Sequence, residues 1–203
     1  MILGFKNKRY LMQYNREKAV RYAIQYAKKP NTIKYPYYKG KDCANFVSQC
    51  LYESGINETG DRWDDLESWF CKSNNSKELK RVSLTWRAAR YFRRYWGNEN
   101  GLGNNRAYQY IELMHNEVLE NINQIYSWIN IGDVIQYGKR KDEYNPSHTQ
   151  IVINKKYNRH NNRMDIFMAQ HSENRIYISL YDYINQFNDK ELRRVYLYKI
   201  AKK

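Results

Sequence analysis

The spacing of apolar residues changes along this chain, and the change limits the folds that it can adopt. Over residues 19–27 the apolar positions recur with the period of an α-helix. In the last third, short β-branched and aromatic runs are separated by Gly, Asn, Asp and charged clusters, which is typical of antiparallel strands. Because helices come first and strands follow, we predict an α+β domain. We expect a single domain, with a helical half over about 14–126 and a sheet half over about 127–203.

Capping residues define two of the expected helices. Asn15 precedes the first, which ends before Pro30, and Asp42 precedes a second that runs over about 43–53. We expect a mostly helical middle of the chain, with further helices over 83–92 and 111–125. The expected strands cover five short segments, which are 133–137, 148–154, 166–170, 176–180 and 195–200.

The second expected helix begins with a cysteine, a position that has its own chemistry. The free backbone N–H groups and the dipole of a helix N-terminus stabilise a thiolate, so the pKa of Cys43 should fall below its usual ~8.5. The same N–H groups can hold the oxyanion that forms when a thiolate attacks an acyl carbon. Cys43 is therefore a candidate nucleophile, whereas Cys50 and Cys71 are interpreted as small apolar side chains of the core.

A thiolate nucleophile needs a base and a group that orients the base. His148 is the best placed base, because it opens an expected strand after a turn-forming segment. His171 ends the following strand and lies beside His148 if the two strands pair as an antiparallel hairpin. Its neighbour Gln170 is the alternative orienting group, and the strand register that decides between them is not fixed by the sequence. His115, within an expected helix, and His160, in a charged loop, are interpreted as structural.

The chain is strongly basic, with 35 Lys and Arg against 21 Asp and Glu and a formal net charge of +14. This balance favours an anionic partner, such as an acidic wall polymer or a membrane surface. No recognisable nucleic-acid module accompanies the scattered basic pairs, so nucleic-acid binding is not expected. Three cysteines without C-x-x-C spacing and four dispersed histidines predict neither a disulfide framework nor a zinc site.

The hydrophobic segments bear on the protein's location. The first ten residues contain too short an apolar run for a signal peptide. No stretch approaches the roughly 18 apolar residues that a transmembrane helix needs. We therefore expect a cytoplasmic protein without a membrane span, unless a signal was removed or export takes a non-classical route.

Several short motifs occur in a specific order along the chain. They are Tyr14-Asn15-Arg16, Asp42-Cys43-Ala44-Asn45-Phe46-Val47-Ser48-Gln49, Ser83-Leu84-Thr85-Trp86-Arg87-Ala88-Ala89, Gly132-Asp133-Val134-Ile135-Gln136-Tyr137, and the segments around His148 and His171. In this order they resemble the bacterial family of putative amidase domains, and the likeness covers about residues 14–180. The block around Cys43 is the most specific of them. The family is similar in plan to the NlpC-type and CHAP cell-wall hydrolases, which share the papain-like fold.

The resemblance implies a papain-like α+β fold, in which a cysteine heads a helix that packs on an antiparallel sheet. It implies Cys43 as the nucleophile, His148 as the base and, by position, His171 as the third member of the triad. One departure is Ala44, which stands where we would expect Thr, a change with no evident chemical cost.

The resemblance also suggests residues that touch the substrate. Tyr37 or Tyr38, in the aromatic loop before the cysteine, is expected to line the site. Asp42 and Asn45 are expected to shape the substrate pocket.

Taken with the residues, the resemblance predicts a cysteine amide hydrolase that acts on peptide or peptidoglycan-like amides. This chemistry needs no metal and no organic cofactor. One alternative is a protein-modifying acyltransferase or deamidase of the same fold. Another is a binding module that keeps the fold without catalysis.

Overall fold

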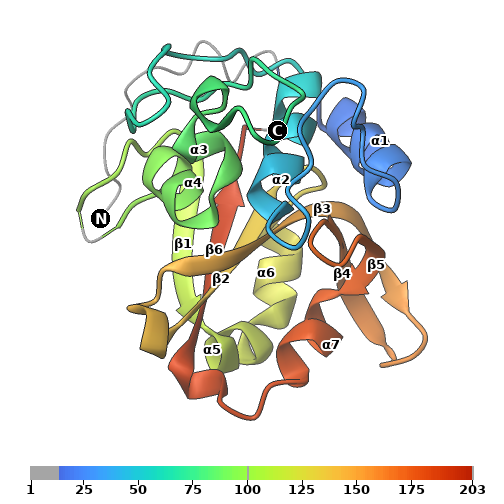
Figure 1. Ribbon diagram of the computed structural model, residues 1–203. Coiled ribbons are helices and arrows are strands. Elements are labelled where there is room, and N and C mark those ends of the chain that lie inside the picture. The colour runs from blue at the N-terminus through green and yellow to red at the C-terminus, as the bar shows by residue number, and fades with distance from the viewer. Residues whose placement is uncertain (1–13, 100, 203) are drawn as a thin grey trace.

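The computed structural model describes residues 14–99 and 101–202, which form an α+β fold around a six-stranded antiparallel sheet. The strand order across the sheet is β1-β6-β2-β3-β4-β5 (Figure 1). The strands are β1 Gln109–Met114, β2 Val134–Lys139, β3 Pro146–Asn158, β4 Arg163–Gln170, β5 Arg175–Ser179 and β6 Arg193–Lys199.

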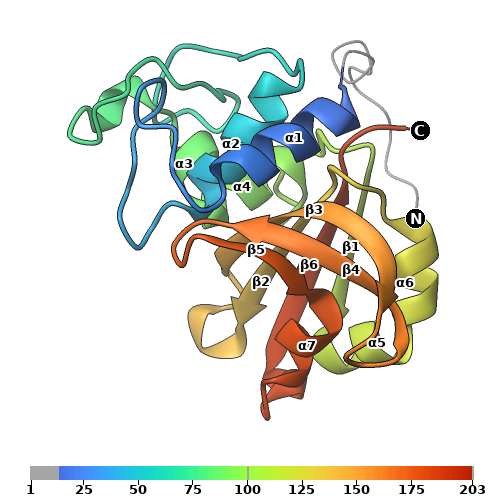
Figure 2. The same cartoon turned by 90° about the vertical axis from the view of Figure 1, so that its right-hand side faces the viewer.

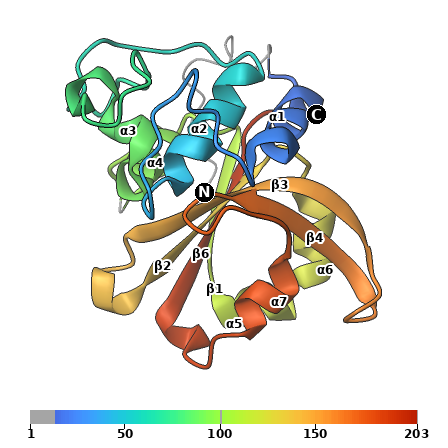
Figure 3. The ribbon, with the colours of Figure 1, turned by 45° about the vertical axis from the view of Figure 1, so that its right-hand side comes forward.

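Helices cover both faces of this sheet. In two further views, α1 to α4 form a layer on one face, and α5 to α7 lie on the other (Figures 2 and 3). The α-helices are α1 Arg16–Tyr26, α2 Cys43–Glu53, α3 Leu84–Arg87, α4 Ala89–Trp96, α5 His115–Glu120, α6 Ile122–Trp128 and α7 Leu180–Asn185. Short 3-10 turns are present at Leu79–Arg81, Arg140–Asp142 and Lys190–Leu192.

Adjacent residues of each central strand belong to two different hydrophobic cores. Val134 and Ile151 pack in the core beneath α1 to α4, whereas their neighbours Ile135 and Val152 pack in the core beneath α5 to α7. Successive side chains of a strand point to opposite faces, so a strand with helices on both sides needs apolar residues at consecutive positions. This explains the continuous apolar runs of the last third of the chain.

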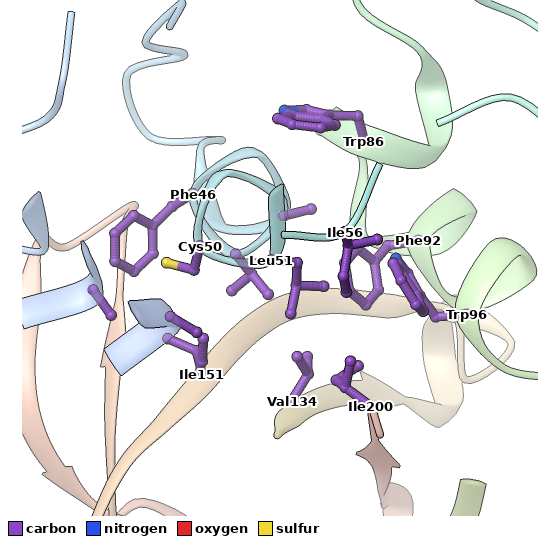
Figure 4. Close-up of a cluster of buried hydrophobic side chains, with 14 of the residues drawn as sticks. Phe46, Cys50, Leu51, Ile56, Trp86, Phe92, Trp96, Val134, Ile151 and Ile200 are labelled. Atoms are coloured by element: carbon purple, nitrogen blue, oxygen red, sulfur yellow. The ribbon is translucent and has the colours of Figure 1, made fainter. Parts of the chain in front are cut away.

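The first core is built around α2. Phe46, Cys50 and Leu51 of this helix belong to the same core as Val134 and Ile151 of the sheet, and Leu51 points from the helix toward the sheet (Figure 4). Aromatic rings close the core on the side of α3 and α4, where Trp69, Trp86 and Trp96 are fully buried. The position of α2 over the centre of the sheet brings its first residue close to the start of β3.

A buried ion pair joins α1 to the sheet. Arg16 Nη1 lies 2.6 Å from Asp133 Oδ1, and the carboxylate also accepts the backbone N–H groups of Asn130 at 2.8 Å and Ile200 at 3.0 Å. Asp133 is fully buried, and its partners satisfy both carboxylate oxygens. The pair therefore fixes the first helix against the beginning of β2.

The α+β prediction and most predicted elements are confirmed. The helix after Asn15 is α1, and the Asn15 side chain accepts the Lys18 N–H at 2.9 Å, as a cap should. The predicted helix over 43–53 is α2, and the five predicted strands match β2 to β6. Among the described residues, no helix is long and apolar enough to cross a membrane.

The prediction of a mostly helical middle is wrong. Residues 55–82 form turns, loops and isolated bridges, with one short 3-10 turn. The helix predicted over 111–125 begins instead as strand β1, which pairs with β6 so that Tyr110 faces Tyr198. Pairing at the sheet edge overrides the local helical spacing there, and the helical part is divided into α5 and α6.

Candidate active site

Cys43 is the first residue of α2, and its side chain is buried apart from 6% exposure. The residue before it, Asp42, occupies the N-cap position, but its side chain makes no capping hydrogen bond. This differs from the usual role of Asp at a helix start. The Asp42 side chain therefore does not occupy the N–H groups of the first turn, and the backbone N–H of Ala44 hydrogen-bonds the cysteine sulfur.

The loop before α2 is braced from behind by two buried polar side chains. Asp42 Oδ1 accepts the backbone N–H of Tyr38 and the Nδ2 of Asn45, both at 2.9 Å. Asn45 Nδ2 also donates to the Pro36 carbonyl at 2.8 Å, and its Oδ1 accepts from Trp86 Nε1 at 2.9 Å. Both side chains are fully buried. Both were expected to shape the substrate pocket, and the structure places them behind the loop whose residues Tyr38, Gly40 and Lys41 line the cleft described below.

The surroundings of Cys43 favour a thiolate. Burial alone would raise the pKa of the thiol, but the hydrogen bond and charge of His148 outweigh it. Backbone N–H groups of Thr149 and Ala44 act in the same direction. The net result is a pKa of Cys43 below its ordinary value. The groups that lower it lie on both α2 and β3.

A bulge at the β2–β3 hairpin sets the position of His148. The residue pairs with Tyr137, and the register then shifts so that Gly138 pairs with Pro146. A side chain at Gly138 could not be accommodated, because its Cβ would lie 2.4 Å from the Tyr144 carbonyl oxygen. The bulge leaves His148 half-buried at the beginning of the regular part of the strand.

The neighbours of His148 raise the pKa of its imidazole. Burial would lower the pKa of the imidazole, but the hydrogen bond and charge of Cys43 raise it, as does a hydrogen bond with Gln170 and the charge of Glu173. The distance from His148 Nε2 to Gln170 Oε1 is 2.7 Å. The lowered pKa of the thiol and the raised pKa of the imidazole together favour a thiolate–imidazolium pair.

The structure places Gln170, not His171, beside His148. Gln170 Oε1 also accepts from Gln150 Nε2 at 2.6 Å, so His148, Gln150 and Gln170 lie on the same face of the sheet. His171 is one residue further on and therefore points to the opposite face. The expectation that His171 orients His148 is thus contradicted by the strand register, and the alternative, Gln170, occupies that position.

His171 instead binds the loop that leads into α2. Its Nδ1 lies 2.5 Å from Asp42 Oδ2, and its Nε2 lies 2.9 Å from the Tyr26 carbonyl oxygen. Its ring stacks on Phe46 with the centroids 4.0 Å apart, and Tyr37 packs against it edge-on at 5.9 Å. His171 is fully buried. It joins β4, α1 and α2 and is a support for the cysteine loop.

Three consecutive residues at the end of β4 therefore connect the two halves of the site. Gln170 holds the imidazole of His148, and His171 holds the Asp42 carboxylate. Ser172 Oγ accepts the backbone N–H of Asp42 at 3.2 Å. This short segment fixes the position of His148 relative to Cys43.

A cleft of about 480 Å³ opens over the side chains of Cys43 and His148. Tyr38, Lys41 and Arg87 line it, as does Ser172, which follows the end of β4. The residues that line it are Tyr38, Gly40, Lys41, Cys43, Leu79, Arg87, Ala88, Ala89, Pro146, Ser147, His148 and Ser172. Of the two tyrosines expected in the site, Tyr38 lines this cleft, whereas Tyr37 packs against His171.

With this geometry established, comparison with known proteins identifies the family. The model of the family described as "Putative amidase domain" matches residues 13–198. The chain belongs to this family. It is also similar to the uncharacterized protein YjcM of Bacillus subtilis (strain 168), with 29% identity over 169 residues. That alignment covers 80% of this chain but only 32% of YjcM, so the chain spans about a third of that relative's length. No solved structure matches.

In this member of the amidase family, the other two cysteines have quite different surroundings from Cys43. Cys50 is fully buried in the first core, and burial raises the pKa of its thiol. Burial also raises the pKa of Cys71 to about 12, and its sulfur donates to the Ser73 carbonyl. Among the described residues, no group of three His, Cys, Asp or Glu side chains is arranged to hold a metal ion. Cys43 is thus the cysteine with both a lowered pKa and a place in the cleft.

Proposed function

We propose that this amidase-family protein is a cysteine-dependent amide hydrolase with a papain-like arrangement of its site. The observation that carries the proposal is the pairing of Cys43, whose pKa is lowered at the start of α2, with His148, whose pKa is raised. The pair lies in an open cleft large enough for a peptide-like substrate. Family membership points to the same reaction class.

In the first half of the reaction, the Cys43 thiolate attacks the carbonyl carbon of the substrate amide. A C–S bond forms, and the oxyanion is stabilised by backbone N–H groups at the start of α2. The imidazolium of His148 donates its proton to the amide nitrogen, and the C–N bond breaks. The amine leaves, and the acyl group stays on Cys43 as a thioester.

In the second half, water resolves the thioester. His148, now neutral, takes a proton from the water as its oxygen attacks the acyl carbon. The C–S bond breaks, a carboxylic acid leaves, and the thiolate–imidazolium pair is restored. Throughout the cycle, Gln170 keeps the imidazole oriented through its 2.7 Å hydrogen bond, as the third member of a triad does.

Peptide or peptidoglycan-like amides are the proposed substrates. Lys41 and Arg87 on the cleft walls favour a substrate that carries negative charge near the scissile bond. Tyr38 adds an aromatic surface whose hydroxyl is buried without a hydrogen-bond partner among the described residues. A polar group of the substrate would satisfy this hydroxyl.

The proposal is tested by incubating the purified protein with wall fragments and with peptide mixtures, followed by mass spectrometry. We expect cleavage that is lost in Cys43→Ala and kept in Cys71→Ala, the matched control for loss of a thiol outside the cleft. Addition of a group to an amine acceptor would indicate acyl transfer instead, and a gain of about one dalton without cleavage would indicate deamidation. Equal behaviour of the two variants would refute a cysteine mechanism.

A further inference from the structure

A second, smaller pocket adjoins the cleft at His148. It has a volume of about 140 Å³ and shares Ser147 and His148 with the catalytic cleft. At its other end it shares Lys139 and Arg193 with a basic groove of about 590 Å³. The residues that line the small pocket are His115, Tyr137, Gly138, Lys139, Ser147, His148, Tyr183, Phe187 and Arg193.

His115, at the start of α5, is the feature of this pocket that points to a ligand. The side chain is only 1% exposed, and neither ring nitrogen has a hydrogen-bond partner among the described residues. Its neighbours are aromatic, with the Tyr137 ring at 6.0 Å and the Phe187 ring at 5.7 Å. Buried polar groups in native proteins are almost always hydrogen-bonded, because leaving one unsatisfied destabilises the folded state. A polar group in the pocket would remove that cost.

The charges around the pocket define the kind of group. Lys139 and Arg193 line it, and no carboxylate does. Asp189 binds Arg193 through Nε at 2.5 Å, which leaves the two terminal nitrogens of the guanidinium without a hydrogen bond to any described residue. Terminal guanidinium nitrogens bind carboxylates well, as charge-assisted donors. The pocket thus offers cationic donors together with a buried imidazole.

We propose that this pocket is a subsite for a small carboxylate group, held by Arg193 and Lys139 with a hydrogen bond from His115. Its volume corresponds to roughly a few water molecules, which limits the occupant to a carboxylate and little more. Because the pocket adjoins His148, the carboxylate would belong to the substrate on the His148 side of the scissile amide. This assignment of the substrate class rests on the proposed amide hydrolase function.

The subsite is tested directly by binding, without turnover. Histidine ring signals are followed by NMR at pH 7 and constant ionic strength during titration with sodium acetate, and the His115 signal is assigned from its absence in His115→Gln. We expect the signal to shift and saturate with acetate and to stay in place with acetamide, which has the same shape without the charge.

A matched pair of charge variants locates the site. Lys139→Gln should weaken acetate binding roughly three- to tenfold. Lys141→Gln removes the same charge from a neighbouring position outside the small pocket and should leave binding unchanged. A His115 signal that does not respond to acetate would mean that the pocket binds no carboxylate, and a signal that moves equally with acetamide would mean that it does not select for charge. Either result would overturn the proposal.

A substrate pair separates this inference from the proposed function. We compare two peptide amides that carry either a carboxylate or a carboxamide on the leaving side. We expect a lower KM for the carboxylate in the wild type and a smaller difference between the two in Lys139→Gln. Acetate binding without cysteine-dependent hydrolysis would reject the function and keep the anion site. Hydrolysis without acetate binding would reject the anion site and keep the function.

Discussion

The burial of His115 should make the protein sensitive to acid. Burial, with the nearby charges of Arg193 and Lys190 outweighing that of Asp189, lowers the pKa of His115 from 6.5 to about 4. The folded state therefore binds the proton less readily than the unfolded chain. The contribution of the neutral side chain to stability is complete above pH 6.5 and is lost as the pH falls from 6.5 to 4.

The size of this effect follows from the two pKa values. Each unit of difference corresponds to about 1.4 kcal/mol, so the full contribution is ~3 kcal/mol and ~2 kcal/mol of it should be lost between pH 7 and pH 4.5. Replacement of the imidazole by an amide in His115→Gln removes the titrating group. The free energy of unfolding of this variant should therefore fall less steeply toward acid than that of the wild type.

The assay is urea unfolding, followed by tryptophan fluorescence, at half-unit steps from pH 7 to about 4.5 in dilute amine buffers without carboxylates. The informative quantity is the difference in slope, since acidic side chains titrate equally in both proteins. His160→Gln is the control, because His160 is exposed. Parallel curves for His115→Gln and the wild type would show that the folded and unfolded states bind the His115 proton equally well.

Three further substitutions test other contacts of the fold and the site. Gln170→Ala should slow alkylation of Cys43 at pH 7 roughly fivefold, because the hydrogen bond that holds the imidazole is worth about 1 kcal/mol. An unchanged rate would exclude Gln170 as the orienting group. Asp133→Ala should lower the free energy of unfolding in urea by about 3 kcal/mol, since the charge of Arg16 loses its buried partner. A loss near zero would mean that this ion pair does not fix α1 against β2. His171→Leu should destabilise the protein by about 1–3 kcal/mol in the same assay, and a neutral result would mean that it does not support the cysteine loop.

Much of the fold could be predicted from the sequence because local signals agree with the final structure there. The cap at Asn15 and the segment from Cys43 onward produce helices where predicted, and strands β2 to β6 follow from short apolar runs. The first strand could not be predicted, because residues 109–114 become a strand only through pairing with β6. Residues 55–82 form loops whose course depends on contacts with distant elements, such as the hydrogen bond from Trp69 Nε1 to Ser48 Oγ.

For the candidate site, the sequence placed Cys43 near His148 but could not choose between Gln170 and His171. That choice depends on strand register, since one residue of shift exchanges the two faces of a strand. Neither could it show that Asp42 turns away from the helix start to bind His171, because this contact joins residues 129 positions apart. His115 was interpreted as structural, and only its burial without hydrogen-bond partners marks it out.

If Cys43 and His148 form a thiolate–imidazolium pair, the pairing is visible in the rate of Cys43 alkylation as a function of pH. Iodoacetamide labelling is read by peptide mass spectrometry in the wild type and in His148→Ala, with the fully buried Cys50 as an internal control. The pairing predicts a rate plateau that begins well below pH ~8.5 in the wild type and is lost in the variant. Slow labelling of Cys43 with the same pH profile in both proteins would show that the pair does not form.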